Sequence, residues 1–350
     1  MRGFLTVDDA VSLVKDYMSA ANTVTSTQEL IDSGVIPELK GFKVKPGKVS
    51  DCVFGGYEGN PQLTTNDGRS LRLMFRTNRI STHDINRGEI PFKDQVLATN
   101  HNYMRKLVEP AIGSSQIDIS GLGMNSTVTA AENLKTIPVE MVVRAFMAKS
   151  TTSTSLYVHY QNGEREFCGH KLPDDLKPNE KLPYLMDTPS TKDKHDLSVA
   201  PEYLFEHNIC TPQQYTQIRN GALEAFGRVA GFLDAREIIL MDTKTEHGVN
   251  SKGQIVGQDE YYTLDSSRYV LKDNYEAAMR EGRDPISYSK QFARDMSIGE
   301  NGYTPEQVVV IAVRYIMAIQ KITGQPFRPD TRGRNQRIIE DTNLILRHVL

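Results

Sequence analysis

The segment 237–264 most constrains the fold, because its charges alternate directly after an apolar run. The run "EIIL" is followed by "MDTKTEHG", in which charged residues occupy every second position: Asp242, Lys244 and Glu246. Successive side chains of a β-strand point to opposite faces, so this alternation predicts a strand with all three on one face. The stretch "QIVGQDEYYTLD" then predicts the returning strand of a β-hairpin.

The turn of this hairpin decides which face Asp259 joins. If Ser251 and Lys252 form a two-residue turn, Lys244 lies opposite Asp259 and both side chains share a face. A register one residue away would place Asp259 on the other face. We predict the first register, which gathers three carboxylates and one ammonium group.

A face of this kind has two interpretations. Clustered carboxylates repel one another unless a strong cation is present. Mg²⁺ suits them because it takes one or two carboxylates and completes its shell with water and substrate phosphates. In the alternative, the face is solvated and its ion pairs contribute about 0–1 kcal/mol each. The spacing by itself is compatible with both.

The rest of the chain alternates helical and extended patterns. Residues 1–40 have apolar residues at helical spacing, and predict an N-terminal extension that is either a packed appendage or an oligomer contact. From Gly41 onward, short strands and glycine turns predict a small β-rich lobe. Helices are predicted at 211–233 and 304–324, where Thr-Pro-x-Gln supplies an N-cap and a capping box.

Three other segments carry weaker patterns. "IPVEMVVRAFMAKS" and "SLYVHYQ" predict strands. Residues 169–200 are rich in Pro, Asp and Lys and predict a long functional loop. Residues 328–337 are basic and predict a mobile tail before a short amphipathic helix.

Composition bounds the class of protein. A chain of 350 residues with 39% hydrophobic and 24% charged residues is typical of a globular protein with two lobes. Its net charge of −3 argues against nucleic acid or an anionic membrane as the main partner. Cys52, Cys168 and Cys210 form no CxxC pair and indicate a reducing compartment. The chain shows no signal peptide and no apolar run of about 20 residues, so a cytoplasmic location is expected.

Three basic features favour anion binding, each beside an ordinary explanation. "KPGKVSD" sets Lys48 in a glycine turn that either lies over phosphates or is a turn only. "TPSTKDKHD" contains Lys192, His195 and Asp196, and is either an anion-and-metal loop or a charged surface loop. Arg144 ends an apolar strand, and is either a fork for phosphate or carboxylate or a structural arginine.

Six segments, in this order along residues 47–327, resemble one known family, the phosphoribosylaminoimidazole-succinocarboxamide synthases (SAICAR synthetases). "GKVSD" resembles the family's GKxRD turn, and "NRISTHD" followed by "IPFK" resembles its DRISAFD segment. "PVEMVVR" with Ser150 downstream is similar to PxExVVR…GS, and "TPSTKDKHD" is similar to TPSTKxxxHD. "DTKTEHG" is similar to DTKFEFG, and "DEYYTLDSSR" is similar to DExxTPDSSR. Their common order makes the resemblance specific.

The resemblance implies an ATP-dependent ligase of de novo purine biosynthesis. ATP would phosphorylate the carboxylate of 5-amino-1-(5-phospho-D-ribosyl)imidazole-4-carboxylate, and L-aspartate would attack the acyl phosphate, giving SAICAR, ADP and phosphate. Mg²⁺ is the implied cofactor. The implied fold is α+β and two-lobed, with the active site in the cleft between a small antiparallel β-rich lobe and a larger ATP-grasp-like lobe. The expected divisions are a helical extension at 1–40, the small nucleotide-covering lobe at 41–136 and the catalytic lobe with C-terminal helices at 137–350.

The resemblance also implies roles for individual residues. The implied catalytic residues are Lys244, Arg268 and Asp242. The implied ATP-binding residues are Lys48, Lys192, Glu246 and Asp259. The implied ribonucleotide-binding residues are Arg79, Ser81, Arg144, Ser150, Lys244, Ser267 and Arg268. The implied Mg²⁺ ligands are Glu246, Asp259 and Asp196.

Five positions depart from the family pattern. They are Asn78 for Asp, Lys149 for Gly, Thr245 and His247 for two aromatic residues, and Leu264 for Pro. None of these removes an implied ligand, so they bear on the shape of the pocket. Two alternatives stay open: an ATP-dependent small-molecule phosphotransferase of related fold, and a non-catalytic nucleotide-binding homologue. The oligomeric state, including a homo-oligomer, is also open.

Overall fold

The computed structural model describes residues 3–19, 26–83, 85–150, 152, 154–192 and 196–350. The chain forms two compact units. Unit 1 comprises Met1–Tyr103, Ser115–Leu134 and Ala293–Leu350, and unit 2 comprises Met104–Ser114 and Lys135–Phe292. Residues 293–350, expected with the catalytic lobe, therefore belong to the same unit as the N-terminal strands. No helix in the described ranges is both long and apolar enough to cross a membrane.

Unit 1 is built on an antiparallel sheet with the order β1-β2-β5 and a separate hairpin, β3-β4. The strands are β1 (Ser50–Phe54), β2 (Leu71–Arg76), β3 (Arg79–Thr82), β4 (Ile85–Glu89) and β5 (Val128–Glu132). The helices are α1 (Val7–Ser19), α2 (Thr27–Asp32), α3 (Lys93–Val108), α8 (Gln291–Met296), α9 (Pro305–Thr323) and α10 (Arg334–Val349), with short 3₁₀ turns at Pro37–Leu39 and Tyr57–Gly59. Of these, α3 continues into unit 2 after Tyr103, and α8 begins there.

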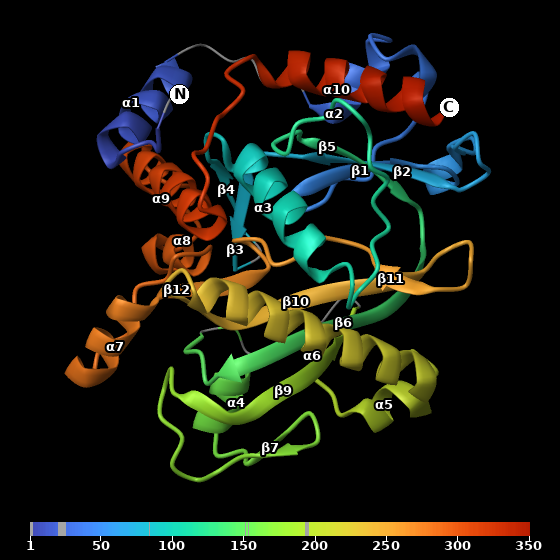
Figure 1. Ribbon diagram of the computed structural model, residues 1–350. Coiled ribbons are helices and arrows are strands. Elements are labelled where there is room, and N and C mark those ends of the chain that lie inside the picture. Colours follow the sequence, from blue (N-terminus) through green and yellow to red (C-terminus); the bar gives the residue numbers. More distant parts are fainter. Residues whose placement is uncertain (1–2, 20–25, 84, 151, 153, 193–195) are drawn as a thin grey trace. The chain divides into compact units, whose positions relative to one another are not determined.

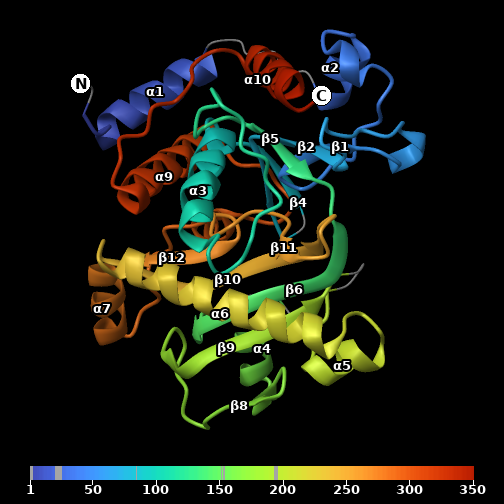
Figure 2. The same cartoon turned by 45° about the vertical axis from the view of Figure 1, so that its right-hand side comes forward.

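The N-terminal extension is packed into unit 1. Leu30 and Ile31 of α2 join one buried cluster with strand residues such as Val53 and with Ile345 and Leu346 of α10. Both helices lie above the β1-β2-β5 sheet in Figure 1 and in the turned view of Figure 2. Of the two possibilities left open by the sequence, packing against the lobe is the one observed.

The basic C-terminal segment is more ordered than expected. α10 begins at Arg334, inside the stretch predicted to be mobile, and the side chains of Arg334 and Arg337 are buried. Arg337 forms a buried ion pair with Asp94 of α3, with Nη2 at 3.0 Å from Oδ2. The prediction of a mobile segment was wrong, because a buried carboxylate neutralises one of its arginines and holds it against α3.

Unit 2 is built on a five-stranded antiparallel sheet with the order β11-β10-β6-β9, in which β12 also pairs with β10. The strands are β6 (Lys135–Phe146), β9 (Lys181–Thr191), β10 (Ile238–Val249), β11 (Ile255–Gly257) and β12 (Ser267–Leu271). The two-residue strands β7 (Glu166–Phe167) and β8 (His170–Lys171) form a small hairpin. The helices are α4 (Leu156–Gln161), α5 (Pro201–Glu206), α6 (Pro212–Asp234) and α7 (Lys272–Glu281).

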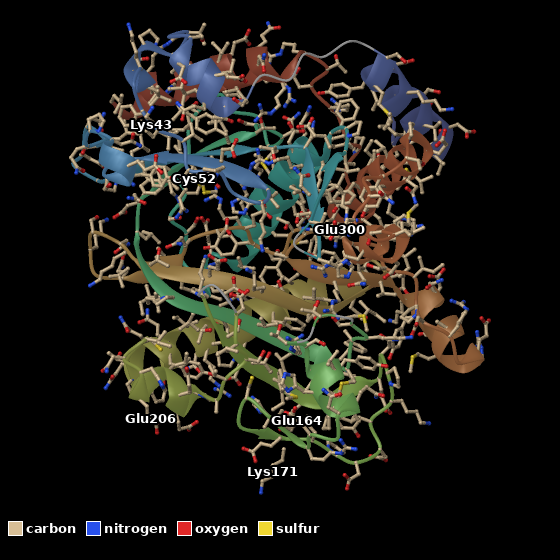
Figure 3. The ribbon with its side chains drawn as sticks, turned by 180° about the vertical axis from the view of Figure 1, so that it is seen from behind. Lys43, Cys52, Glu164, Lys171, Glu206 and Glu300 are labelled. Carbon is tan, nitrogen blue, oxygen red and sulfur yellow. The ribbon has the colours of Figure 1, made fainter. Side chains whose placement is uncertain are left out.

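Helix α6 covers one face of this sheet, as Figures 1 and 2 show. It begins with the predicted capping box, in which Thr211 accepts from the backbone of Gln214, and Thr304 starts α9 in the same way. Figure 3 is drawn from behind, so the face of the unit 2 sheet opposite α6 is turned toward the viewer. Charged side chains can occupy that face, because α6 does not cover it.

Two predicted elements of unit 2 were wrong. "SLYVHYQ" forms helix α4, not a strand, because the Ser155 hydroxyl caps it by accepting from the backbone N–H of Val158. The expected loop at 169–200 contains β9, which pairs with β6 over most of its length. Pro183 and Pro189 favoured the prediction of a loop. β9 is an edge strand, however, and proline is tolerated in edge strands.

Candidate functional site

A row of charged residues occupies the face of the unit 2 sheet opposite α6. In the β6–β10 register, Arg144 pairs with Asp242, Val142 with Lys244, and Glu140 with Glu246. Directly paired residues of antiparallel strands share a face, so the predicted alternation of β10 is confirmed and β6 contributes to the same row. Asp242 also pairs with Arg268 on β12. The row therefore draws on three strands.

At one end of the row, two guanidinium groups meet one carboxylate. Arg144 Nη1 lies 3.3 Å from Asp242 Oδ2, and Arg268 Nε lies 3.5 Å from Asp242 Oδ1. Arg144 Nε also donates to Thr188 Oγ1 at 2.9 Å. Burial lowers the pKa of the Arg144 guanidinium, and the neighbouring Asp242 opposes that effect. Two cations facing one anion leave positive charge for an anionic ligand.

At the other end, lysines bridge two glutamates. Lys244 Nζ lies 2.5 Å from Glu140 Oε1 and 3.1 Å from Glu246 Oε1, and Lys192 Nζ bonds the other oxygen of Glu246. The sequence interpretation missed Glu140. Its signal was present, since it lies four residues before Arg144 on a strand and must share that residue's face.

The predicted hairpin register was wrong by one residue. His247 pairs with Gly257 and Val249 with Ile255, so three residues, Ser251 to Gly253, form the turn. Gly253 adopts a positive φ of 75°, which permits this longer turn. β11 ends at Gly257, so Asp259 lies beyond the pairing and its side chain is exposed.

The implied Mg²⁺ ligands are not gathered into a ready metal site. Among the described residues, no three His, Cys, Asp or Glu side chains are grouped as metal ligands, and both Asp196 and Asp259 are exposed. His195 lies outside the described residues. Glu246 does fit a cation site, because its buried carboxylate already takes positive charge from two ammonium groups. Mg²⁺ also supplies positive charge to carboxylate oxygens, so it could bind Glu246 in place of an ammonium group.

Two serines implied for the ribonucleotide have different surroundings. Ser267 pairs with Thr243, which alternates with Asp242, and their hydroxyl groups are 2.7 Å apart on the side facing away from the charged row. Ser150 is buried just beyond Lys149, and its hydroxyl accepts from the backbone N–H of Thr152 at 3.2 Å. Ser267 therefore faces away from the charged row, whereas Arg268 of the row donates to the Lys149 carbonyl, directly before Ser150, at 3.4 Å.

Lys149, which replaces the family's glycine, is held by an ion pair. Its Nζ lies 2.5 Å from Asp284 Oδ2, and its backbone N–H donates to Asn179 Oδ1 at 3.0 Å. Asn179 in turn donates to the other oxygen of Asp284 at 3.1 Å. The added cation is therefore neutralised locally, and the segment before Ser150 is fixed by side chains from two other parts of unit 2.

Two more of the departures, both on β10, alternate with its charged residues and lie on its packing face. Thr245 and His247 are 2% and 1% exposed. Neither ring nitrogen of His247 has a hydrogen-bond partner among the described residues. Burial lowers the pKa of His247 to about 4, so the imidazole is neutral at pH 7.

In unit 1, Lys48 lies in a tight turn before β1. Arg79 donates to the Gly47 carbonyl at 2.8 Å and contacts Asp51, with Nη2 at 2.5 Å from Oδ1. Arg79, expected at the ribonucleotide, is thus bonded to the turn that carries Lys48. Ser81 follows in β3, two residues further on.

Comparison with known proteins gives a consistent result. The family model described as SAICAR synthetase matches residues 62–308. The phosphoribosylaminoimidazole-succinocarboxamide synthase of Bacteroides thetaiotaomicron is 33% identical over 302 residues, covering 81% of this chain and 91% of the relative. The chloroplastic synthase of Arabidopsis thaliana is 32% identical over 330 residues, covering 90% of this chain and 73% of the relative.

The solved structures agree at the level of fold. The SAICAR synthase of Saccharomyces cerevisiae, complexed with SAICAR, superposes with a TM-score of 0.69 at 22% identity, covering 88% of this chain and all of that one. A SAICAR synthetase in complex with ADP gives a TM-score of 0.59 at 19% identity, covering 82% of this chain. Both support the mixed α+β fold with antiparallel sheets.

Proposed function

The chain belongs to the SAICAR synthetase family, and we propose that the charged row of unit 2 recognises and activates the ribonucleotide in its reaction. The protein is a phosphoribosylaminoimidazole-succinocarboxamide synthase, an ATP-dependent ligase of de novo purine biosynthesis. Its antiparallel sheet with α6 on one face supports the expectation of an ATP-grasp-like catalytic lobe.

The pair of guanidinium groups on Asp242 is the observation that carries this proposal. Arg144 and Arg268 are oriented by the same carboxylate, so their forks are held ready for an anion with two acceptor oxygens, at a lower cost of ordering two long side chains. We assign them to the phosphate or carboxylate of the ribonucleotide. Asp242 is then a positioning residue for both, and Ser150, next to the Lys149 carbonyl that Arg268 bonds, is proposed to complete the ribonucleotide environment.

The lysine and glutamate end of the row suits the nucleotide. Glu246, with Asp259 and Asp196 from the segments after β11 and β9, would hold Mg²⁺, which neutralises phosphate charge when bound. Lys192 and Lys244, now bonded to Glu246, are ammonium groups available to turn toward the transferring phosphoryl group. Lys48, in its glycine turn, would contact the nucleotide phosphates.

These residues perform activation by charge and alignment. The ribonucleotide carboxylate attacks the γ-phosphorus of ATP, the bond to ADP breaks, and an acyl phosphate forms. The aspartate amine then attacks the acyl carbon, the amine proton is lost, and phosphate leaves. Phosphoryl transfer of this kind needs little covalent help from the protein. A site made of arginines, lysines and carboxylates fits that requirement.

An isotope experiment tests the sequence of steps. The ribonucleotide carboxylate is labelled with ¹⁸O and the reaction is run to completion with Mg²⁺, ATP and aspartate. One labelled oxygen is expected in the released phosphate, because that carboxylate oxygen bridges to phosphorus in the acyl phosphate. Phosphate free of label would contradict the proposed intermediate. ADP release that does not depend on aspartate would favour a phosphotransferase instead.

A further inference from the structure

Backbone hydrogen bonds join the two ends of the turn that carries Lys48. Lys45 and Cys52 exchange N–H···O bonds of 2.8 and 2.9 Å, and Cys52 on β1 is labelled in Figure 3. A Cβ at Gly47 would lie 2.3 Å from the carbonyl oxygen of Ser50, so only glycine fits there. The turn is therefore one compact structure with Lys48 near its tip.

The residues on either side of Lys48 are braced from the segment before β3. Thr77 donates to the Val49 carbonyl from its backbone N–H at 3.0 Å and from its hydroxyl at 2.7 Å. Arg79 Nη2 donates to the Gly47 carbonyl at 2.8 Å. The two carbonyls that flank Lys48 are thus held by side chains two positions apart.

Arg79 is itself held from the N-terminal extension. Its guanidinium contacts both oxygens of Asp51, and Asp51 Oδ2 also accepts from the hydroxyl of Thr27 at 2.8 Å. Thr27, the first residue of α2, is only 2% exposed. Arg334 of α10 donates to the same hydroxyl oxygen at 3.5 Å. A chain of polar contacts therefore runs from Thr27 through Asp51 and Arg79 to the turn.

We propose that Thr27 is a positioning residue for the nucleotide turn, so that the N-terminal extension forms part of the ATP site. Without the Thr27 hydroxyl, Asp51 loses a buried donor and can rotate, and Arg79 loses the anchor that directs it to Gly47. The ammonium group of Lys48 would then sample more positions. This inference rests on the proposed role of Lys48 in binding the nucleotide phosphates.

The test is steady-state kinetics of the full-length protein, with ATP and the ribonucleotide varied in turn. Thr27→Val keeps the shape and removes the hydroxyl, and is expected to raise the KM for ATP about fivefold. The kcat and the KM for the ribonucleotide should stay within about twofold of wild type, because the contacts of the charged row are untouched. Thr27→Ser restores the hydroxyl and should restore the KM for ATP.

Thr129→Val is the matched control. Thr129 is also a buried threonine of unit 1 whose hydroxyl bonds a charged side chain, Arg76, at 2.6 Å. It makes no contact with Asp51 among the described hydrogen bonds, so its loss should lower stability without raising the KM for ATP. If Thr27→Val and Thr129→Val have the same KM for ATP, or if Thr27→Val raises both KM values equally, the inference is wrong.

Lys48→Met separates this inference from the proposed function. If Lys48→Met raises the KM for ATP and Thr27→Val does not, only the role of Thr27 fails. If Lys48→Met leaves the KM for ATP unchanged, the assignment of the turn to the nucleotide fails, and the role of Thr27 falls with it. In the double variant, Thr27→Val should add little to Lys48→Met, because both changes act through the same turn.

Discussion

Glu140 and Glu246 lie directly opposite each other on neighbouring strands, and Lys244 Nζ bonds both carboxylates. Like charges at such a cross-strand position are destabilising unless a cation separates them. Lys244 supplies that cation in the described structure. Its removal must therefore affect folding as well as chemistry, and the two effects can be separated.

Lys244→Met is expected to lower the free energy of unfolding by about 1–3 kcal/mol, because it leaves two buried carboxylates without their shared partner. The double variant Lys244→Met/Glu140→Gln should recover most of that loss, since only one charge remains. Turnover should be lost in both variants, because both lack the ammonium group of Lys244. Urea unfolding and a turnover assay measure the two properties, and a double variant no more stable than Lys244→Met would contradict the explanation.

Arg268→Lys is expected to raise the KM for the ribonucleotide about tenfold while leaving the KM for ATP nearly unchanged. A lysine cannot reproduce the planar fork that Asp242 orients. The matched control is Arg283→Lys, an exposed arginine of unit 2 paired with Glu281 at 2.6 Å, which should leave both KM values at the wild-type level. If Arg268→Lys raises the KM for ATP as much as the KM for the ribonucleotide, Arg268 contacts the nucleotide and the assignment is wrong.

His247→Phe is expected to raise the free energy of unfolding by about 1–2 kcal/mol. The wild-type protein buries two imidazole nitrogens that have no partner in the described structure, and a phenyl ring removes that desolvation cost. Thermal and urea unfolding measure the gain. His159→Phe is the control, because His159 bonds Glu164 at a more exposed position, and a gain of equal size there would contradict the burial argument.

The His170–Asp187 pair predicts a pH dependence of stability. His170 Nε2 lies 2.9 Å from the Asp187 carbonyl oxygen and 3.4 Å from its carboxylate, and these contacts raise the pKa of His170. A raised folded-state pKa means that the contribution is fully present below the unfolded value of about 6.5. It is then lost as the pH rises through the folded-state pKa.

Urea unfolding of wild type and His170→Gln between pH 6 and pH 9 measures this contribution. The difference in the free energy of unfolding between the two proteins should be largest at pH 6 and should shrink toward pH 9. A difference that is constant with pH would show that the charge on His170 contributes nothing.

The positions of site residues were predictable where the alternation of side chains along one strand determines them. The face shared by Asp242, Lys244 and Glu246 follows from the alternation of side chains along one strand. The position of Asp259 did not follow, because it depends on the length of a turn whose glycine adopts a positive φ. The period of β6 places Glu140 on the face of Arg144, but its pairing with Glu246 joins residues far apart in the sequence, and no periodicity along one strand reports that pairing.

The fold was predictable where capping signals are strong, as at Thr211 and Thr304. Helix α4 was mistaken for a strand because its aromatic and β-branched residues favour strands locally, and the cap at Ser155 outweighs that preference. The ion pair of Lys149 with Asp284 could not be read from the sequence either, since it depends on where the segment after α7 returns in unit 2.

The discontinuous make-up of unit 1 sets an order for folding during synthesis. Its core joins Leu30 and Val53, which precede most of unit 2 in the chain, to Ile345 and Val349, which follow it. Most of unit 2 is a continuous segment, Lys135–Phe292, that leaves the ribosome complete while α10 is still unmade. Domains generally fold as units as they emerge. We therefore expect unit 2 to fold before unit 1, whose N-terminal strands stay partly exposed until α10 has been made.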